Sequence, residues 1–187
     1  MDDKTGNRTE IGRRFVRQRR PFQDVSERLV YTDGSCTRNG REDATGHSIV
    51  AYEPKLDAPV YLTTKRSLMD MAVTRSHTLP DQTLYGRLRY IRPSSNRAKL
   101  YATILALQAC PWAKEGGKTL VVAGDLKYVV RGITEWVWRW RENGWIKSDG
   151  DRVKNVDLWE LLLERILELY EQGVTVKFWK VPRVKSA

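Results

Sequence analysis

The spacing of apolar residues changes near residue 96, and this change constrains the fold more than any other feature of the sequence. Before residue 96 the chain reads as extended segments that are separated by turns. The first segment, 28–32, is apolar and β-branched, and the turn-forming sequence Asp33-Gly34-Ser35 ends it. We predict strands at 28–32 and 47–52, further extended stretches at 60–64 and 84–91, and a long loop over 65–82.

Beyond residue 96 the period becomes helical, with Leu100, Ile104 and Leu107 on one side of a helix that either Ser94 or Ser95 caps. The continuous apolar run at 119–123 suits a strand that is buried on both faces. Further helices are predicted at about 127–140 and 157–172, and a closing strand at 174–179. This order predicts an α/β fold whose mixed sheet begins antiparallel and continues with parallel strands joined by helices.

The charge balance favours a polyanionic partner. Lysine and arginine number 33 against 23 acidic residues, which gives a net charge of +10. Each phosphate that such a surface neutralises releases counterions, so nucleic acid is the natural candidate, and a basic protein without this partner is the alternative. Residues 1–25 are polar and basic and predict a flexible N-terminal arm. Within it, 13–20 reads as a nuclear localisation signal, a nucleic-acid arm or a solvated tail.

The compartment follows from cysteine usage and from the lack of long apolar segments. Cys36 and Cys110 match no metal-binding spacing, which predicts reduced thiols and an intracellular location, nuclear or cytoplasmic. No apolar run approaches the roughly 18 residues that a membrane helix needs, so no membrane partner is expected.

Two aspartates follow predicted strands. Asp33 ends the first strand, and Asp125 comes directly after the run at 119–123. If these strands are neighbours, both carboxylates meet at one sheet edge and can share Mg²⁺, which prefers oxygen ligands. Because aspartate is also common in turns, position alone leaves the structural interpretation open.

Several segments resemble, in the right order, the motifs of the type 1 ribonuclease H family. They are 30–36 (VYTDGSC), 95–102 (SNRAKLYA), 124–129 (GDLKYV), 132–136 (GITEW), 143–145 (NGW), 153–159 (VKNVDLW) and 178–183 (FWKVPR). The last is similar to the form in fungal members. The resemblance covers about residues 28–183. It implies a ribonuclease H-like three-layer fold with a mixed five-stranded sheet flanked by helices, which here forms a domain over 26–187.

The resemblance also implies hydrolysis of the RNA strand of RNA–DNA hybrids with Mg²⁺ or Mn²⁺. The family holds its metal with four carboxylates in the pattern Asp, Glu, Asp, Asp. Asp33 stands at the first position and Asp125 at the third, but Lys99 replaces the glutamate. The final aspartate normally lies beyond the last strand, and this chain is truncated after that strand. The catalytic site is therefore expected to be incomplete, with any metal weakly bound.

The lysine changes the local charge by two units. A pair of unit charges about 4 Å apart interacts by roughly 4 kcal/mol at an effective dielectric near 20, so an ammonium here repels a divalent ion. We hypothesise that Lys99 replaces the metal as a fixed cation, pairing with Asp33 and Asp125 in the free protein and turning toward a backbone phosphate in the complex. The alternative is that its ammonium simply extends to solvent.

More of the family's nucleic-acid-binding residues than of its metal-binding carboxylates have counterparts in this sequence. The resemblance assigns contacts with backbone and sugar hydroxyls to small polar side chains, and contacts with the DNA strand to a basic protrusion. Of the tryptophans, Trp136, Trp140 and Trp159 are expected in the core, with Trp138 and Trp145 at the surface. The predicted contact residues are Cys36, Asn39, Ser95, Asn96, Arg139, Arg141, Trp145, Lys147, Lys154 and Asn155.

The sequence therefore predicts a protein that recognises RNA–DNA hybrid or a related duplex, with hydrolysis weak or lost. One rival is an active Mg²⁺-dependent hybrid endoribonuclease, which needs a carboxylate from elsewhere. Another is a protein-interaction adaptor that keeps the fold for stability, for which the sequence names no partner.

Overall fold

The structure is a computed structural model that describes residues 27–39, 41–52, 73–79, 91–125 and 127–181. Its elements, in chain order, are β1 (Glu27–Thr37), β2 (Thr45–Tyr52), β3 (Val73–Thr78), α2 (Ser95–Leu107), β4 (Thr119–Gly124), α3 (Lys127–Arg131), the π-helical turn η3 (Gly132–Trp136), α4 (Val137–Glu142), α5 (Val156–Glu171) and β5 (Thr175–Lys180). None of the helices in these ranges is long and apolar enough to cross a membrane. The predicted arm, the stretch at 60–64 and nearly all of 84–91 lie outside the described residues.

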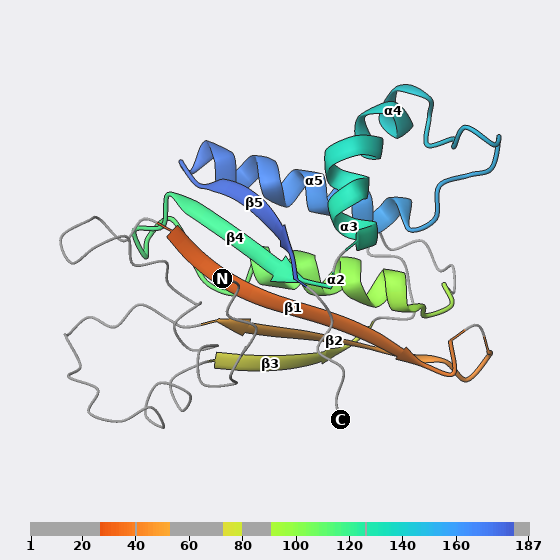
Figure 1. The fold of residues 1–187 in the computed structure, drawn as a ribbon, viewed down its shortest axis with the longest axis horizontal. Helices are drawn as coiled ribbons and strands as arrows, with labels where there is room; N and C mark the ends of the chain where they lie inside the picture. The colour runs from red at the N-terminus through yellow and green to blue at the C-terminus, as the bar shows by residue number, and fades with distance from the viewer. Residues whose placement is uncertain (1–26, 40, 53–72, 80–90, 126, 182–187) are drawn as a thin grey trace, which may run out of the picture.

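The five strands form one mixed sheet in the order β3-β2-β1-β4-β5 (Figure 1). The pairs β1–β2 and β2–β3 are antiparallel, whereas β4 runs parallel to both β1 and β5. Parallel neighbours need a crossover connection, and the segment from α3 to α5 provides it between β4 and β5. The predicted α/β fold, with a mixed five-stranded sheet flanked by helices, is confirmed.

One strand lies where a loop was predicted. β3 occupies 73–78, inside the predicted loop at 65–82, and it pairs with β2. Thr74, Arg75 and Ser76 are all exposed, so the segment lacks the alternation of apolar and polar residues that identifies a strand. β3 is a strand because its backbone pairs with β2, and backbone pairing does not require any particular side-chain pattern.

The first strand is longer than predicted. β1 does not end at Asp33 but continues to Thr37, because its antiparallel pairing with β2 extends from Val30 to Thr37. Its parallel pairing with β4 stops earlier, at Tyr31 opposite Ala123. Asp33 therefore marks the point where β1 separates from β4, and not the end of the strand.

A single apolar core joins the sheet to the helices. Val30, Leu120 and Val122 are fully buried on the face that meets Leu100 of α2 and Leu158 of α5. α2 packs against β1, β2 and α5, and α5 also contacts β5 (Figure 1). This packing fixes the first turn of α2 and the start of α3 at the same end of β4, where the candidate site lies.

The helix predicted at about 127–140 is interrupted at Gly132. α3, η3 and α4 follow one another over 127–142, with the π-helical turn over Gly132–Trp136. A Cβ at residue 132 would lie 2.1 Å from Cη2 of Trp159, so the absence of a side chain lets this segment pack directly on the indole of α5.

Candidate functional site

The middle of β1 lies against the start of α2 because Gly34 has no side chain. A Cβ at residue 34 would lie 2.3 Å from the backbone nitrogen of Lys99 and 2.4 Å from the carbonyl carbon of Ala98. Ser48, the cross-strand partner of Gly34, donates a hydrogen bond of 2.7 Å to the Ala98 carbonyl oxygen. The Asp33-Gly34 sequence predicted a turn, but in the structure Gly34 lies within β1. Its close contact with α2 brings Lys99 next to the sheet.

The N-terminus of α2 is fixed by Ser94, as one of the two predicted caps. Its hydroxyl accepts a hydrogen bond of 3.2 Å from the backbone N–H of Arg97, and its backbone is extended as a cap requires. Ser95 and Asn96 form the first turn, with Asn96 exposed. Both predicted contact residues therefore stand at the end of the helix that faces the candidate site.

Asp33 and Asp125 lie at the same end of the two central strands. The parallel pairing of β1 and β4 stops with Tyr31 opposite Ala123, two residues before each aspartate. Asp33 is exposed, and its Oδ1 accepts a hydrogen bond of 2.7 Å from the backbone N–H of Gly34. Both aspartates thus follow the last residues that pair between β1 and β4, and their direct convergence on one metal stays a prediction.

Lys99 is bound to one of these aspartates. Its Nζ lies 3.1 Å from Oδ2 of Asp125 and donates a second hydrogen bond of 2.9 Å to the Asp125 backbone oxygen. The side chains are only 16% and 31% exposed, so the pair is partly shielded from water. The ion pairs of the described residues include no bond from Lys99 to Asp33. Of the two predicted partners, Asp125 is the one that pairs.

This arrangement does not fit a divalent cation well. Within the described residues, no group of three or more His, Cys, Asp or Glu side chains could hold a metal ion. Asp33 and Asp125 remain as oxygen ligands, but the ammonium of Lys99 already holds Oδ2 of Asp125. A cation would have to displace that ammonium or tolerate its charge nearby.

A polar pocket of about 320 Å³ opens next to this ion pair. Two of the residues that line it, Lys127 and Arg131, were not predicted as contacts, although basic residues four apart at the start of a helix indicate a shared face. Arg131 pairs with Glu135 and lies 5.5 Å from the ring centre of Trp136. The full lining is Asn96, Lys99, Asp125, Lys127, Tyr128, Arg131 and Trp136.

The charges around this pocket favour an anion. Lys99, Lys127 and Arg131 carry three positive charges, against the single carboxylate of Asp125 within the lining. The indole of Trp136 and the phenol of Tyr128 add aromatic faces. Cations beside aromatic rings form the combination that binds a phosphodiester backbone and its bases or sugars.

Asn155 has its side chain positioned by a hydrogen bond from a buried arginine. Its backbone has a φ of 61°, a left-handed conformation that asparagine tolerates better than most residues. Its Oδ1 accepts a hydrogen bond of 3.4 Å from Arg97, whose guanidinium is fully buried and also pairs with Asp157. Asn155 further hydrogen-bonds to the Tyr128 hydroxyl, which accepts a bond from Trp159 Nε1. Burial raises the pKa of Tyr128, so this phenol stays protonated at neutral pH.

The predicted protrusion contains α4 and the loop that follows it. Arg139, Arg141 and Lys154 are exposed, whereas Trp145 is half-buried with a left-handed φ of 63°. Lys147 is less available than predicted, because its ammonium pairs with Asp149 at 2.8 Å and with Asp151 at 3.3 Å. The hydrogen bond with Asp149 is the main reason why the pKa of Lys147 is raised.

Of the five tryptophans with a predicted position, Trp159 is buried and Trp138 exposed as predicted, whereas Trp136, Trp140 and Trp145 are all half-buried. Trp159 is fully buried, and Trp140 stacks between it and Trp136 with ring centres 5.6 Å apart on each side. Trp138 is 57% exposed. Trp136, assigned to the core, is half-buried and also lines the polar pocket.

The remaining predicted contact residues lie on β1 and just beyond it. Cys36 is half-buried near the end of the strand, and burial raises the pKa of its thiol. Asn39 is exposed in the turn that leads to β2. Neither side chain lines the polar pocket with Asn96 and Lys99.

The chain matches known proteins over most of its length. The model of the RNase H family matches residues 26–181. A ribonuclease H of Treponema pallidum subsp. pallidum is 33% identical over 133 residues, which cover 71% of this chain and 69% of that protein. A ribonuclease H of Escherichia coli is 41% identical over 73 residues, which cover 39% of this chain and 44% of that protein.

The fold has a solved counterpart. A foamy viral protease–reverse transcriptase, whose structure was determined in complex with dsDNA, aligns with a TM-score of 0.54 and 18% identity. The alignment covers 84% of this chain and 82% of that one. At this identity the likeness concerns the fold alone.

Proposed function

This chain belongs to the ribonuclease H family, and on that premise we propose that it binds RNA–DNA hybrid and hydrolyses the RNA strand weakly or not at all. The proposal comprises two separable statements, one about recognition and one about chemistry. Each rests on different residues, and each has its own measurement.

The ion pair between Lys99 and Asp125 carries the chemical statement. The family reaction uses divalent metal, and two such ions roughly 3.5–4 Å apart would activate water and stabilise the leaving oxygen. Here the ammonium of Lys99 takes one of the two available carboxylates, at 3.1 Å from its oxygen. Asp33, the other carboxylate, is exposed to solvent. This donor set does not fit a two-metal array, so no hydrolytic step is assigned to it.

The polar pocket supports the statement about recognition. Lys99, Lys127 and Arg131 supply a cationic surface next to Asp125, where Lys99 can exchange its carboxylate partner for a backbone phosphate. Asn96 at the pocket and Asn155 behind it supply small polar groups. Such groups can read the 2′-hydroxyl in the minor groove of an A-like duplex, and this hydroxyl distinguishes hybrid from duplex DNA.

The test uses labelled RNA–DNA hybrid with the native chain and two variants, in Mg²⁺, in Mn²⁺ and in chelator. We expect the native chain to bind hybrid equally well with and without metal, to prefer it over duplex DNA, and to leave the RNA strand intact. Lys99→Glu removes the fixed cation and restores a carboxylate. Its binding should weaken in chelator and recover partly with Mg²⁺, because two adjacent carboxylates without a cation repel phosphate.

Asp33→Asn separates the proposal from the enzymatic rival. RNA cleavage by the native chain that Asp33→Asn abolishes would establish a metal-dependent endoribonuclease and would overturn the chemical statement. An adaptor that merely keeps the fold predicts weak, steeply salt-screened binding with no preference for hybrid over duplex DNA. That outcome would overturn the statement about recognition.

A further inference from the structure

Helix α5 has apolar side chains on two sides, and only one of these sides is buried in the core. Leu158, Trp159 and Leu162 face inward and are fully buried. On the adjacent side Leu167 is 57% exposed and Tyr170 is 69% exposed. A surface helix normally has one apolar stripe and a polar remainder, so this second apolar side indicates a partner that covers it.

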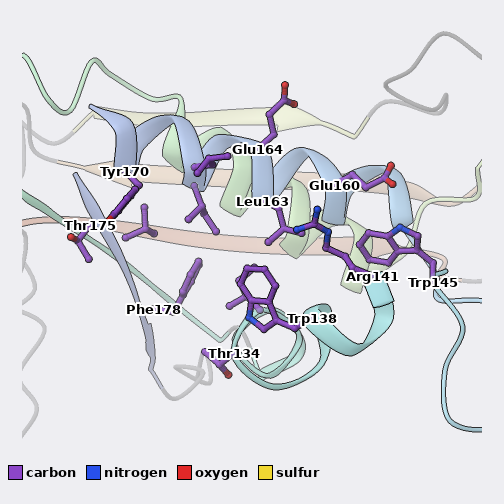
Figure 2. A pocket seen from close by; sticks show the side chains of 14 residues that line it. Thr134, Trp138, Arg141, Trp145, Glu160, Leu163, Glu164, Tyr170, Thr175 and Phe178 are labelled. Atoms are coloured by element: carbon purple, nitrogen blue, oxygen red, sulfur yellow. The ribbon is translucent and has the colours of Figure 1, made fainter. Parts of the chain in front are cut away.

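Leu167 and Tyr170 belong to one wall of a groove of about 720 Å³ (Figure 2). This groove shares no lining residue with the polar pocket beside Lys99 and Asp125. Phe178 of β5 forms the second wall, and Trp138 of α4 the third, with its indole turned toward the groove. Most of the lining residues are apolar or aromatic. Its exposed aromatic rings make it a surface for side chains such as phenylalanine and isoleucine.

Two carboxylates stand at the rim of the groove, against one cation, Arg141, at its end. Glu160 and Glu164 line it along the edge of α5 that lies away from Trp138 (Figure 2), and both are exposed. This is unusual for a chain with a net charge of +10. An apolar groove beside two carboxylates fits a segment that alternates apolar side chains with cations.

The chain itself contains such a segment. Between residues 11 and 22 it carries Ile11, Phe15, Val16 and Phe22 among five arginines, with no acidic residue. We propose that residues 11–22 of this chain occupy the groove, with their apolar side chains against α5 and β5 and their arginines beside Glu160 and Glu164.

The path of the chain permits this contact. Glu27 begins β1 opposite Thr119 of β4, and Thr119 lies opposite Thr175 of β5, which lines the groove. Neighbouring strands are about 4.8 Å apart, so the chain enters the sheet roughly 10 Å from that residue. Phe22 precedes Glu27 by five residues, which span up to about 17 Å. Tethering at this range gives the segment an effective concentration near the millimolar range.

Occupancy of the groove would place arginines next to the predicted protrusion. Arg141 and Trp145 line the end of the groove and belong to the predicted nucleic-acid contacts. The segment would thereby extend the basic surface of α4. This inference does not depend on hybrid binding or on the state of the metal site.

Trypsin provides the test, because it cuts after the arginines of the segment itself. The full chain is compared with Leu167→Lys, which places a cation in the groove, and with Glu164→Lys, which reverses a rim charge. The matched control is Glu171→Lys, since Glu171 is exposed on the same helix but does not line the groove. The rate of cleavage at residues 13–20 is followed by mass spectrometry without nucleic acid.

We expect cleavage in the native chain and in Glu171→Lys to be slower by roughly fivefold or more than in Leu167→Lys and Glu164→Lys, because a docked segment is cut only when it is released. The double change Ile11→Asp and Phe15→Asp should release the segment in the same way. Equal cleavage rates in all of these proteins would overturn the proposal. Protection that increases with protein concentration would also overturn it, because a second copy would then be the occupant.

Discussion

Arg97 and Asp157 form a two-point ion pair inside the protein. NH1 and NH2 of the guanidinium lie 2.9 Å and 2.7 Å from the two carboxylate oxygens, and the arginine side chain is fully buried. Arg97 precedes the site residue Lys99 on α2, and Asp157 lies in the first turn of α5, two residues after Asn155. The pair therefore joins the two helices whose N-termini carry predicted nucleic-acid contacts.

Replacement of Arg97 by methionine should be costly, because it leaves the carboxylate of Asp157 buried without a partner. We expect the free energy of unfolding in urea to fall by about 3–5 kcal/mol. Arg97→Met combined with Asp157→Leu should recover most of this loss. Arg165→Met is the control, because its pair with Glu168 is partly exposed, at 30% and 41%, and should contribute about 1 kcal/mol. A double variant as unstable as the single one would show that the unpaired charge is not the cause.

Lys127 should contribute to hybrid binding mainly through a phosphate. It is exposed and lines the polar pocket beside Asp125. Lys127→Ala should weaken binding and reduce the slope of log K against log salt by about one. Lys118→Ala removes an equally exposed lysine just before β4, at the opposite end of that strand from Asp125, and should leave the slope unchanged. Identical slopes for the two variants would remove Lys127 from the interface.

Gly132→Ala should destabilise the protein although it lies in a helical segment. Alanine normally stabilises a helix by about 1 kcal/mol relative to glycine. Here its Cβ would lie 2.1 Å from the buried ring of Trp159, and such overpacking costs about 1–3 kcal/mol. In a Trp159→Phe background the same change should cost less, since the smaller ring leaves room. Thermal unfolding of the four proteins measures this coupling, and additive effects would contradict it.

The two cysteines should differ in reactivity. Burial, together with the charge of Glu115 and a hydrogen bond to it, raises the pKa of Cys110 to about 12. At pH 8 only about one thiol in ten thousand would then be ionised. Iodoacetamide should therefore label Cys36 and leave Cys110 intact in the folded protein, and label both at similar rates in urea. Rapid labelling of Cys110 at pH 8 would contradict its shielded environment.

Much of the site could be predicted because local sequence determines it. The strand at 119–123, the helix that Ser94 caps and the glycine next to Asp33 each carry a signal within a few residues. Aspartates just after two predicted strands then suggested one shared site, although β1 in fact continues past Asp33 to Thr37. Lys127 and Arg131 were missed because a basic pair on a helix is usually a solvated face, and only the position of α3 next to Asp125 gives the pair another role.

By itself, the sequence determined the order and type of the elements other than β3 in the described residues, since apolar periodicity, caps and turn residues act over short distances. Tertiary structure alone decided features that depend on residues far apart in the chain. β3 exists because β2 offers it hydrogen bonds, and β1 continues beyond Asp33 for the same reason. Likewise, Lys99 pairs with Asp125 and not with Asp33, because the fold sets which carboxylate a lysine on α2 can reach.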